Sequence, residues 1–243
     1  MMILALLLAL VPQDEAAAKS ALEAYKTATA KSKDPKVHVD AVNELAKTLH
    51  SSVAEKLGSL LATDDKDVRI AAAVGLSNFS KPPELKASAA KHLTQALTAG
   101  ANLKFVDVRI AIFQALGVLQ EESSANAVKS HFEDKDTKIA GAAVSAAGNM
   151  KCKSLVEPLI QLLRDCERTV NGGALPLPPP VKGGKPPPAP APQKDMDKEK
   201  KDHASALIGP AGSALSTLTG QNLKSGDEYE KWWIKNRSSF VPK

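Results

Sequence analysis

The two cysteines are the residues whose types most readily do chemistry, because paired thiols form disulfides or bind metal ions. Cys152 and Cys166 flank one predicted helix, 14 residues apart. That separation places them roughly 21 Å apart along the helix, whereas a disulfide needs Cα atoms within about 7 Å. They cannot pair within this helix, and we expect buried free thiols, not a redox or metal site.

Other motifs of catalysis or cofactor binding are missing from the sequence. It contains no Gly-rich phosphate loop, no Gly-x-Ser-x-Gly elbow and no Cys-x-x-Cys pair. The net charge is +5, but residues 171–201 hold six Lys and three acidic residues, which leaves only +2 for the rest. We therefore expect neither a catalytic centre nor the basic footprint of a nucleic-acid binder.

A short helical pattern recurs along the chain and predicts its architecture. It is clearest from Val68 and from Val108, and weaker copies start at Val37 and Ile139, giving spacings of 31, 40 and 31 residues. Each copy is preceded by another apolar helical segment: 14–31, 52–61, 84–98 and 124–132. Aromatic residues make up only 4% of the chain, which suits closely packed helices. Repeats of this length indicate stacked helical hairpins in an all-α fold.

Several segments between these helices are expected to mark helix starts or turns. Ser52 to Glu55 and Ser154 to Glu157 have the capping-box pattern, in which Ser and Glu side chains satisfy free amides at a helix start. Residues 100–105 are expected to form a longer turn.

The segment 171–201 interrupts the repeat after the helix that begins at Leu155. It holds nine of the sixteen prolines and ends in a charged run from Lys194 to Lys201, so we expect it to be extended and disordered. The pattern resumes when Leu207 takes the place of Val68. We interpret 171–201 as an insertion inside the last hairpin, followed by residues 202–243, which hold its second helix and a C-terminal cap.

The two ends of the chain have distinct compositions. Residues 1–13 begin with an uninterrupted apolar run to Val11, too short to span a bilayer and placed like the core of a signal peptide. We expect a periplasmic or secreted protein, the alternative being a packed first helix in a cytoplasmic one. At the other end, Trp232 and Trp233 are expected to cap the last hairpin, the alternative being a ligand platform.

The copies resemble HEAT repeats, particularly the short bacterial form. The resemblance rests on Asp65 to Leu76 and on Asp107 to Leu119, and the ending from Leu218 to Trp233 is similar to exported HEAT proteins. It implies a right-handed α-solenoid of about five hairpins over most of residues 14–170 and 202–243. It also implies a structural ladder of turn aspartates and second-helix arginines, here Asp65, Asp67, Arg69, Asp107 and Arg109.

Enzymes of this family give further tests. Those that resemble di-iron hydroxylases need His-Glu pairs, and none of the five histidines (His38, His50, His92, His131 and His203) is followed by Glu. Those that resemble DNA glycosylases need a basic face with aromatics, which is not expected here. A chromophore lyase is disfavoured by the few aromatics. We therefore expect no enzyme activity, no cofactor and no metal.

The resemblance implies that the second helices line a concave surface. Register with Val68 points to Asn43, Asn78, Gln114, Ser145 and Asn149 as exposed binding residues, with Lys47, Val74, Val118, Ser213 and Thr217 beside them. This neutral face suits a protein or peptide partner, the alternative being a merely solvated surface. We expect a non-catalytic protein-interaction scaffold without a transmembrane segment. The alternative functions are a structural cell-envelope component and, less favoured by the sequence, a HEAT-like lyase or chromophore-binding enzyme. Pro187, Pro188 and Pro190 in the insertion offer a second binding mode.

Overall fold

The chain folds into helices that lie in two rows. The computed structural model describes residues 11–172 and 194–242, and within them there is no β-strand. One row, the second-helix row, contains α3 (Pro35–Leu45), α5 (Lys66–Ser77), α8 (Val106–Leu119), α10 (Thr137–Asn149) and α12 (Lys194–Thr219). The helices that precede these form the first-helix row: α2 (Val11–Lys31), α4 (Ser51–Leu60), α6 (Pro83–Thr98), α9 (Ala125–Lys129) and α11 (Val156–Val170). The prediction of an all-α protein is confirmed.

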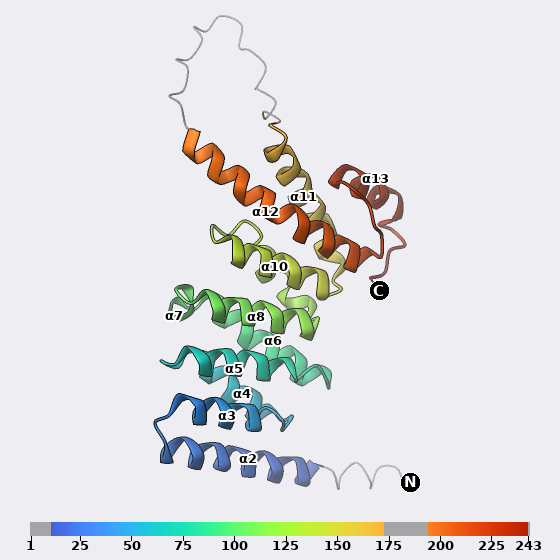
Figure 1. Ribbon diagram of the computed structural model, residues 1–243. Coiled ribbons are helices and arrows are strands. Elements are labelled where there is room, and N and C mark those ends of the chain that lie inside the picture. The colour runs from blue at the N-terminus through green and yellow to red at the C-terminus, as the bar shows by residue number, and fades with distance from the viewer. Residues whose placement is uncertain (1–10, 173–193, 243) are drawn as a thin grey trace, which may run out of the picture.

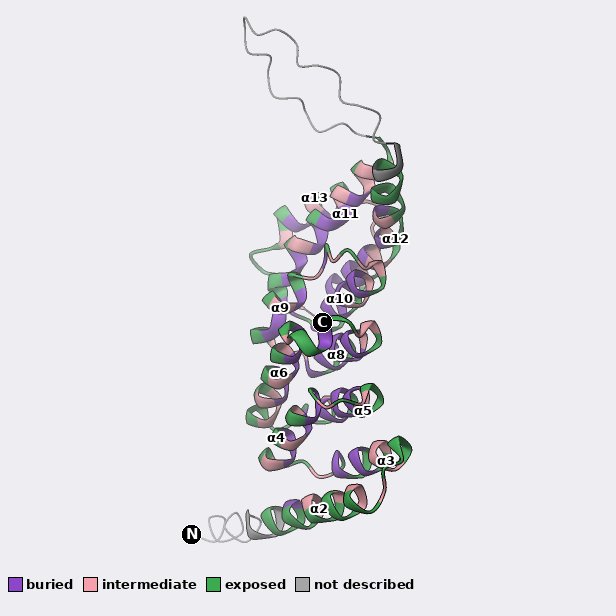
Figure 2. Cartoon of the chain, turned by 90° about the vertical axis from the view of Figure 1, so that its left-hand side faces the viewer, coloured by how far each residue is buried: buried purple, intermediate pink, exposed green. Residues whose placement is uncertain are grey.

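Contacts run both along and between the rows. In the second-helix row α3 packs on α5, α5 on α8, α8 on α10 and α10 on α12 (Figure 1). Seen from the side, α4, α6, α9 and α11 lie opposite this row, and the buried residues are concentrated between the two (Figure 2). Each helix therefore buries one side against its hairpin partner and another against its neighbours along the row.

Small residues allow the second-helix row to pack closely. A Cβ atom added to Gly75 would lie 2.8 Å from the Cβ of Ala46, the C-cap of α3, and one added to Gly148 would lie 2.7 Å from the Cα of Ala214 on α12. Such distances are below van der Waals contact, so glycine is required at these helix crossings. The Ala-rich and Gly-containing composition of the repeat thus has a direct packing reason.

The longer spacing of 40 residues between Val68 and Val108 arises mainly from the first helix, since α6 has 16 residues where α4 has 10, and in smaller part from an extra helical turn. The predicted turn at 100–105 instead contains α7 (Gly100–Leu103). Asn102 on α7 is fully buried and donates to the carbonyl oxygens of Leu61 and Ala96, at 3.1 and 3.0 Å. Its side-chain oxygen accepts from Nη1 of Arg69 at 2.7 Å. The extra turn α7 is therefore held by a polar network, because buried polar groups need hydrogen-bond partners.

Both predicted capping boxes are wrong. Helix α4 is capped by His50, whose ring nitrogen Nδ1 accepts from the amide of Ser52 at 3.2 Å. Ser154 lies in the short 3-10 helix η2 (Lys153–Leu155) and donates to Glu122, just before the N-cap Leu155 of α11. An imidazole nitrogen can accept the capping hydrogen bond in place of a serine oxygen. The helix then starts before Ser52, and the residues from Ser52 to Glu55 only resemble a capping box.

Part of the segment predicted as an insertion is helical. Residues 194–201, expected to be extended, form the first turns of α12. Lys and Glu favour helices, and a helix already held by packing from Ala204 onward can extend at little cost. The part of the predicted insertion at 173–193 lies outside the described residues, as do residues 1–10 of the predicted signal peptide. Beyond α12, α13 (Gly226–Asn236) lies beside α11 (Figure 1).

Candidate functional site

The second-helix row presents an exposed line of side chains, which we call the second-helix face. The sequence register with Val68 predicts ten side chains on this face, and all ten are exposed in the structure: Asn43, Lys47, Val74, Asn78, Gln114, Val118, Ser145, Asn149, Ser213 and Thr217. They occupy two positions four residues apart in each repeat, with Lys47 and Asn78 just after the ends of α3 and α5, so they share one side of the row. The structure thus places these residues on a common surface.

Some polar groups on this face are already used within the protein. Asn78, the C-cap of α5, donates from Nδ2 to the carbonyl oxygen of Ala46, the C-cap of the neighbouring α3, at 3.2 Å. Ser145 donates to the carbonyl oxygen of Gly141 within its own helix, at 2.8 Å. Among the hydrogen bonds between described residues, none involves the side chain of Gln114. Asn78 therefore joins two helices, whereas Gln114 is the better candidate for contact with a partner.

The middle of the second-helix face is apolar. Val74 on α5 and Val118 on α8 keep 52% and 57% of their surface exposed, and Ile70 and Ile110 beside them are half-buried. Two exposed aliphatic side chains thus lie on adjacent, directly packed helices. Sequence register predicted the two valines, but not the contribution of the isoleucines.

The predicted Asp–Arg ladder has a different membership in the structure. Asp65 caps α5 by accepting from the amides of Asp67 and Val68. Arg69 is buried and binds Asn102, together with the carbonyl oxygens of Thr63 and Ala101. Asp67 and Asp107 are both exposed. Arg69 thus ties together loops of two repeats without an aspartate.

Arg109 does form an ion pair with an aspartate, but with Asp134 of the following hairpin. Nη2 of Arg109 lies 2.6 Å from Oδ2 of Asp134, and both side chains are largely buried. Burial by itself raises the pKa of Asp134, but hydrogen bonds from Arg109 and from the amide of Asp136 hold the pKa below its ordinary value. This pair is a structural link between hairpins.

The C-terminal tryptophans lie in a cluster on α13. Trp233 is buried, and Phe240 packs edge-on against both Trp232 and Trp233. Helix α13 is held on α11 by Arg164, which pairs with Asp227 at 2.8 Å and with Glu230 at 2.6 Å. The tryptophans therefore sit beside the first helix of the last hairpin rather than across α12.

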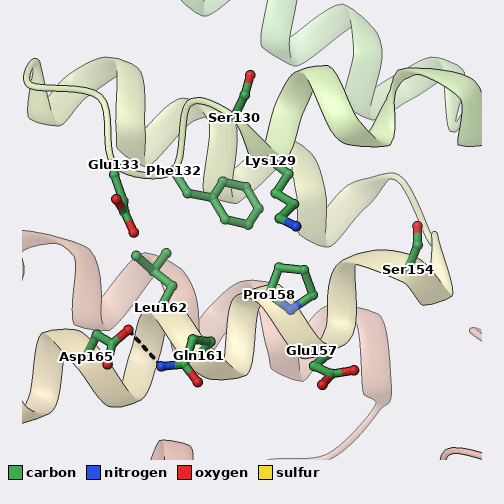
Figure 3. Close-up of a pocket in the computed structure, with 10 residues that line it drawn as sticks. All are labelled: Lys129, Ser130, Phe132, Glu133, Ser154, Glu157, Pro158, Gln161, Leu162 and Asp165. Carbon is green, nitrogen blue, oxygen red and sulfur yellow. Dashed lines mark hydrogen bonds between the residues drawn. The ribbon is translucent and has the colours of Figure 1, made fainter.

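A groove between α9 and α11 was not predicted from the sequence (Figure 3). Its volume is about 660 Å³. Phe132 points from the turn after α9 toward Leu162 and Pro158 on α11, and carboxylates stand at the edges. The groove exists because α9 has only 5 residues, whereas α11 has 15. Nothing in the sequence indicated the groove, because the segment predicted at 124–132 is nearly as long as the one at 52–61.

The two cysteines are buried and unpaired, as predicted. Burial raises the pKa of the Cys152 thiol to about 12 and that of Cys166 to about 11, and neighbouring carboxylates add to both shifts. A thiol with so high a pKa is a poor nucleophile and metal ligand at neutral pH. In the part of the chain that the structure describes, no three His, Cys, Asp or Glu side chains gather as metal ligands would.

Comparisons with known proteins leave the chain without an assigned family. No family model matches it, and no curated protein is similar to it. Among solved structures, an engineered protein is 16% identical with a TM-score of 0.42, and the match covers 75% of this chain and 76% of that chain. Similarity at this level carries no argument about function. Across residues 11–172 and 194–242, none of the helices combines the length and apolarity that crossing a bilayer requires.

Proposed function

We propose that the protein is a non-catalytic interaction scaffold, a right-handed α-solenoid of about five HEAT-like hairpins that binds a protein or peptide on its second-helix face. The observation that carries this proposal is the exposed line of neutral and aliphatic side chains along five successive helices. An array of this kind offers an extended surface whose contacts repeat with the helices, which is the usual mode of binding in helical repeat proteins.

The chemistry of the face defines the kind of partner. Val74 and Val118 provide apolar contact in the middle of the row, and Gln114 between them can both donate and accept a hydrogen bond. On α10 and α12 the second-helix face carries hydroxyl and amide groups, those of Ser145, Asn149, Ser213 and Thr217. We infer an uncharged, partly apolar protein segment as the partner. The apolar residues 1–11 further favour an exported protein.

The test is a comparison of partners captured by two variants with matched charge changes. Gln114→Glu with Val118→Glu places two carboxylates on the second-helix face. Ala87→Glu with Gln95→Glu places two on exposed positions of α6, on the other side of the molecule. We expect affinity purification with mass spectrometry to recover the same partners with the wild type and the α6 variant, and to lose them with the first variant.

An unchanged set of partners with Gln114→Glu and Val118→Glu, in a protein whose circular dichroism matches the wild type, would overturn the proposed binding face. Asn78 is left unchanged because its hydrogen bond to Ala46 gives it a structural role.

A further inference from the structure

Helix α4 is capped by a histidine and not by the serine, threonine, aspartate or asparagine that usually caps a helix. Nδ1 of His50 lies 3.2 Å from the amide nitrogen of Ser52 and 2.8 Å from its hydroxyl oxygen. An imidazole nitrogen can accept a hydrogen bond only while it carries no proton. The cap of α4 therefore requires the neutral ring of His50.

Protonation of His50 weakens this cap in two ways. Nδ1 becomes a donor, which still suits the hydroxyl of Ser52 but leaves the Ser52 amide without its acceptor. The new positive charge also lies at the N-terminus of α4, where the helix dipole is unfavourable to a cation. No salt bridge between described residues involves His50. The charge therefore gains no ionic partner in the described fold.

A second histidine contacts the same helix from the neighbouring α6. The half-buried ring of His92 lies against the backbone of α4 at Gly58, where an added Cβ atom would be 2.5 Å from both Cγ and Nδ1 of the ring. Burial lowers the pKa of His92 below its ordinary value. Glu55 on α4 acts to raise this pKa, and Lys91 on α6 acts to lower it further. The neutral ring is therefore the form that packs on α4.

The two histidines give a pH effect of the same sign. Because the pKa of His92 is lowered by folding, its packing stabilises the fold fully above the unfolded-state pKa of about 6.5. This stabilisation is lost as the pH falls through the folded-state pKa. Protonation of His50 likewise removes an acceptor that the fold uses. Both contributions to the stability of α4 therefore decrease in acid.

The other three histidines have contacts that tolerate protonation. Nε2 of His38 lies 2.8 Å from the carbonyl oxygen of Ser32, and Nδ1 of His131 lies 2.9 Å from that of Ala127. A carbonyl oxygen only accepts, so these ring nitrogens donate, and a second proton on the ring leaves both bonds in place. His203 contacts a hydroxyl group, which can donate or accept. The two histidines at α4 are thus the ones whose contacts need a neutral ring.

We propose that α4 is an acid-sensitive element of the stack, in which protonation of His50 and His92 weakens the cap and the packing together and releases α4 locally from α5 and α6. The helix buries Val53, Leu57 and Leu60, so its release exposes an apolar surface that is covered at neutral pH. Because α4 lies in the first-helix row (Figure 2), this inference does not depend on the proposed binding function of the second-helix face.

Hydrogen exchange of the α4 amides measures this opening. In the wild type, their protection factor should fall roughly tenfold from about pH 7.5 to about pH 5.5, after correction for the intrinsic exchange rate at each pH. His50→Asn with His92→Gln keeps a capping oxygen but has no titrating ring, so the fall should be less than about twofold. The control, His38→Gln with His131→Gln, should behave like the wild type.

Urea distinguishes local opening from unfolding of the whole chain. Below the unfolding transition at about pH 5.5, exchange of α4 should depend on the urea concentration less steeply than exchange of α8, because local opening exposes less surface.

Two results would overturn the proposal. One is an equal fall of protection in the wild type and in His50→Asn with His92→Gln, and the other is an equal urea dependence of α4 and α8. Circular dichroism at neutral pH checks that the double variants fold. If the double variant at α4 is unfolded, His50→Asn alone replaces it, because Asn supplies the same cap. Its protection should fall only about threefold, and a fall as large as that of the wild type would contradict the role of His50.

Discussion

At the scale of single residues, polar side chains link the hairpins at points where the backbone cannot form regular hydrogen bonds. Asn102 and Arg69 hold the extra turn α7 to the loops around it, and Arg109 reaches Asp134 in the next hairpin. Each of these groups is buried or nearly so, and removing one partner leaves the other without compensation for its lost hydration. Stability should therefore be sensitive to these few polar residues.

Asn102→Ala should destabilise the protein by about 3 kcal/mol, because it removes one of the acceptors of the buried Arg69 and the donor to the carbonyl oxygens of Leu61 and Ala96. Asn126→Ala, at an exposed position on α9, should change stability by less than about 0.5 kcal/mol. Urea unfolding followed by circular dichroism measures both. Equal effects of the two substitutions would contradict a special role for the α7 network.

Asp134→Asn tests the pair with Arg109. Because the folded-state pKa of Asp134 is held below its ordinary value, the carboxylate stabilises the fold above the unfolded-state pKa, and this stabilisation is lost as the pH falls through the folded-state pKa. We expect the variant to be less stable by about 2 kcal/mol near neutral pH. It should also lose less stability than the wild type on acidification below about pH 4.

The comparison is made by urea unfolding at neutral and acidic pH, with Asp40→Asn as the control at an exposed position on α3. If Asp134→Asn and the wild type lose stability in parallel as the pH falls, the ion pair is not the source of the pH dependence.

At the scale of secondary-structure elements, glycines decide how closely helices approach. Gly148 on α10 and Gly75 on α5 leave no room for a Cβ atom at their crossings, whereas Gly141 on α10 has no neighbour within 4 Å of such an atom. Glycine within a helix costs conformational entropy, so it is favourable only where packing requires it. The two glycines of α10 therefore make a matched pair.

Gly148→Ala should destabilise the protein by roughly 1–3 kcal/mol, since α12 must move away from α10. Gly141→Ala should stabilise it by about 0.5–1 kcal/mol through helix propensity alone. Thermal unfolding of the two variants distinguishes these effects by their opposite signs. Stabilisation by both substitutions would show that the α10–α12 crossing is less tight than described.

The docking of α13 depends on Gly226. A Cβ atom at this position would meet the side chain of Arg164 and lie 2.9 Å from its backbone nitrogen. Gly226→Ala should therefore loosen α13 from α11 and expose Trp233. Because both tryptophans of the chain lie on this helix, a red shift of the fluorescence with unchanged helical circular dichroism is the expected result. An unshifted spectrum would contradict it.

At the scale of the whole molecule, burial is uneven along the stack. Of the described side chains of α2, only Ala18 is buried, whereas α8 contributes nine buried residues and has helices packed on both sides. Local stability in a chain of packed helices follows the contacts that each makes with its neighbours. The first helix should therefore open without the centre.

Hydrogen exchange measured by mass spectrometry should show the fastest exchange in α2 and the slowest in α8. The amides of α2 should exchange through local opening, without dependence on the stability of the whole protein. Exchange of both helices at one common rate would mean that the stack unfolds as a single unit.

The sequence by itself determined the helical rows. Apolar positions at helical spacing, repeated every 31 or 40 residues, predicted the helices of both rows and the exposed positions on the second, because helix periodicity decides which side of a helix is buried. The burial of both cysteines was expected from their separation along one helix and from the general behaviour of free thiols.

Only the tertiary structure decided which polar groups meet. Arg109 pairs with Asp134 and not with a nearer aspartate, Arg69 binds Asn102, and α13 docks on α11, since each partner comes from a different hairpin. The α9–α11 groove likewise depends on the different lengths of two helices that are distant in the sequence. Local patterns carry no information about such distances, because they are fixed by how the hairpins stack.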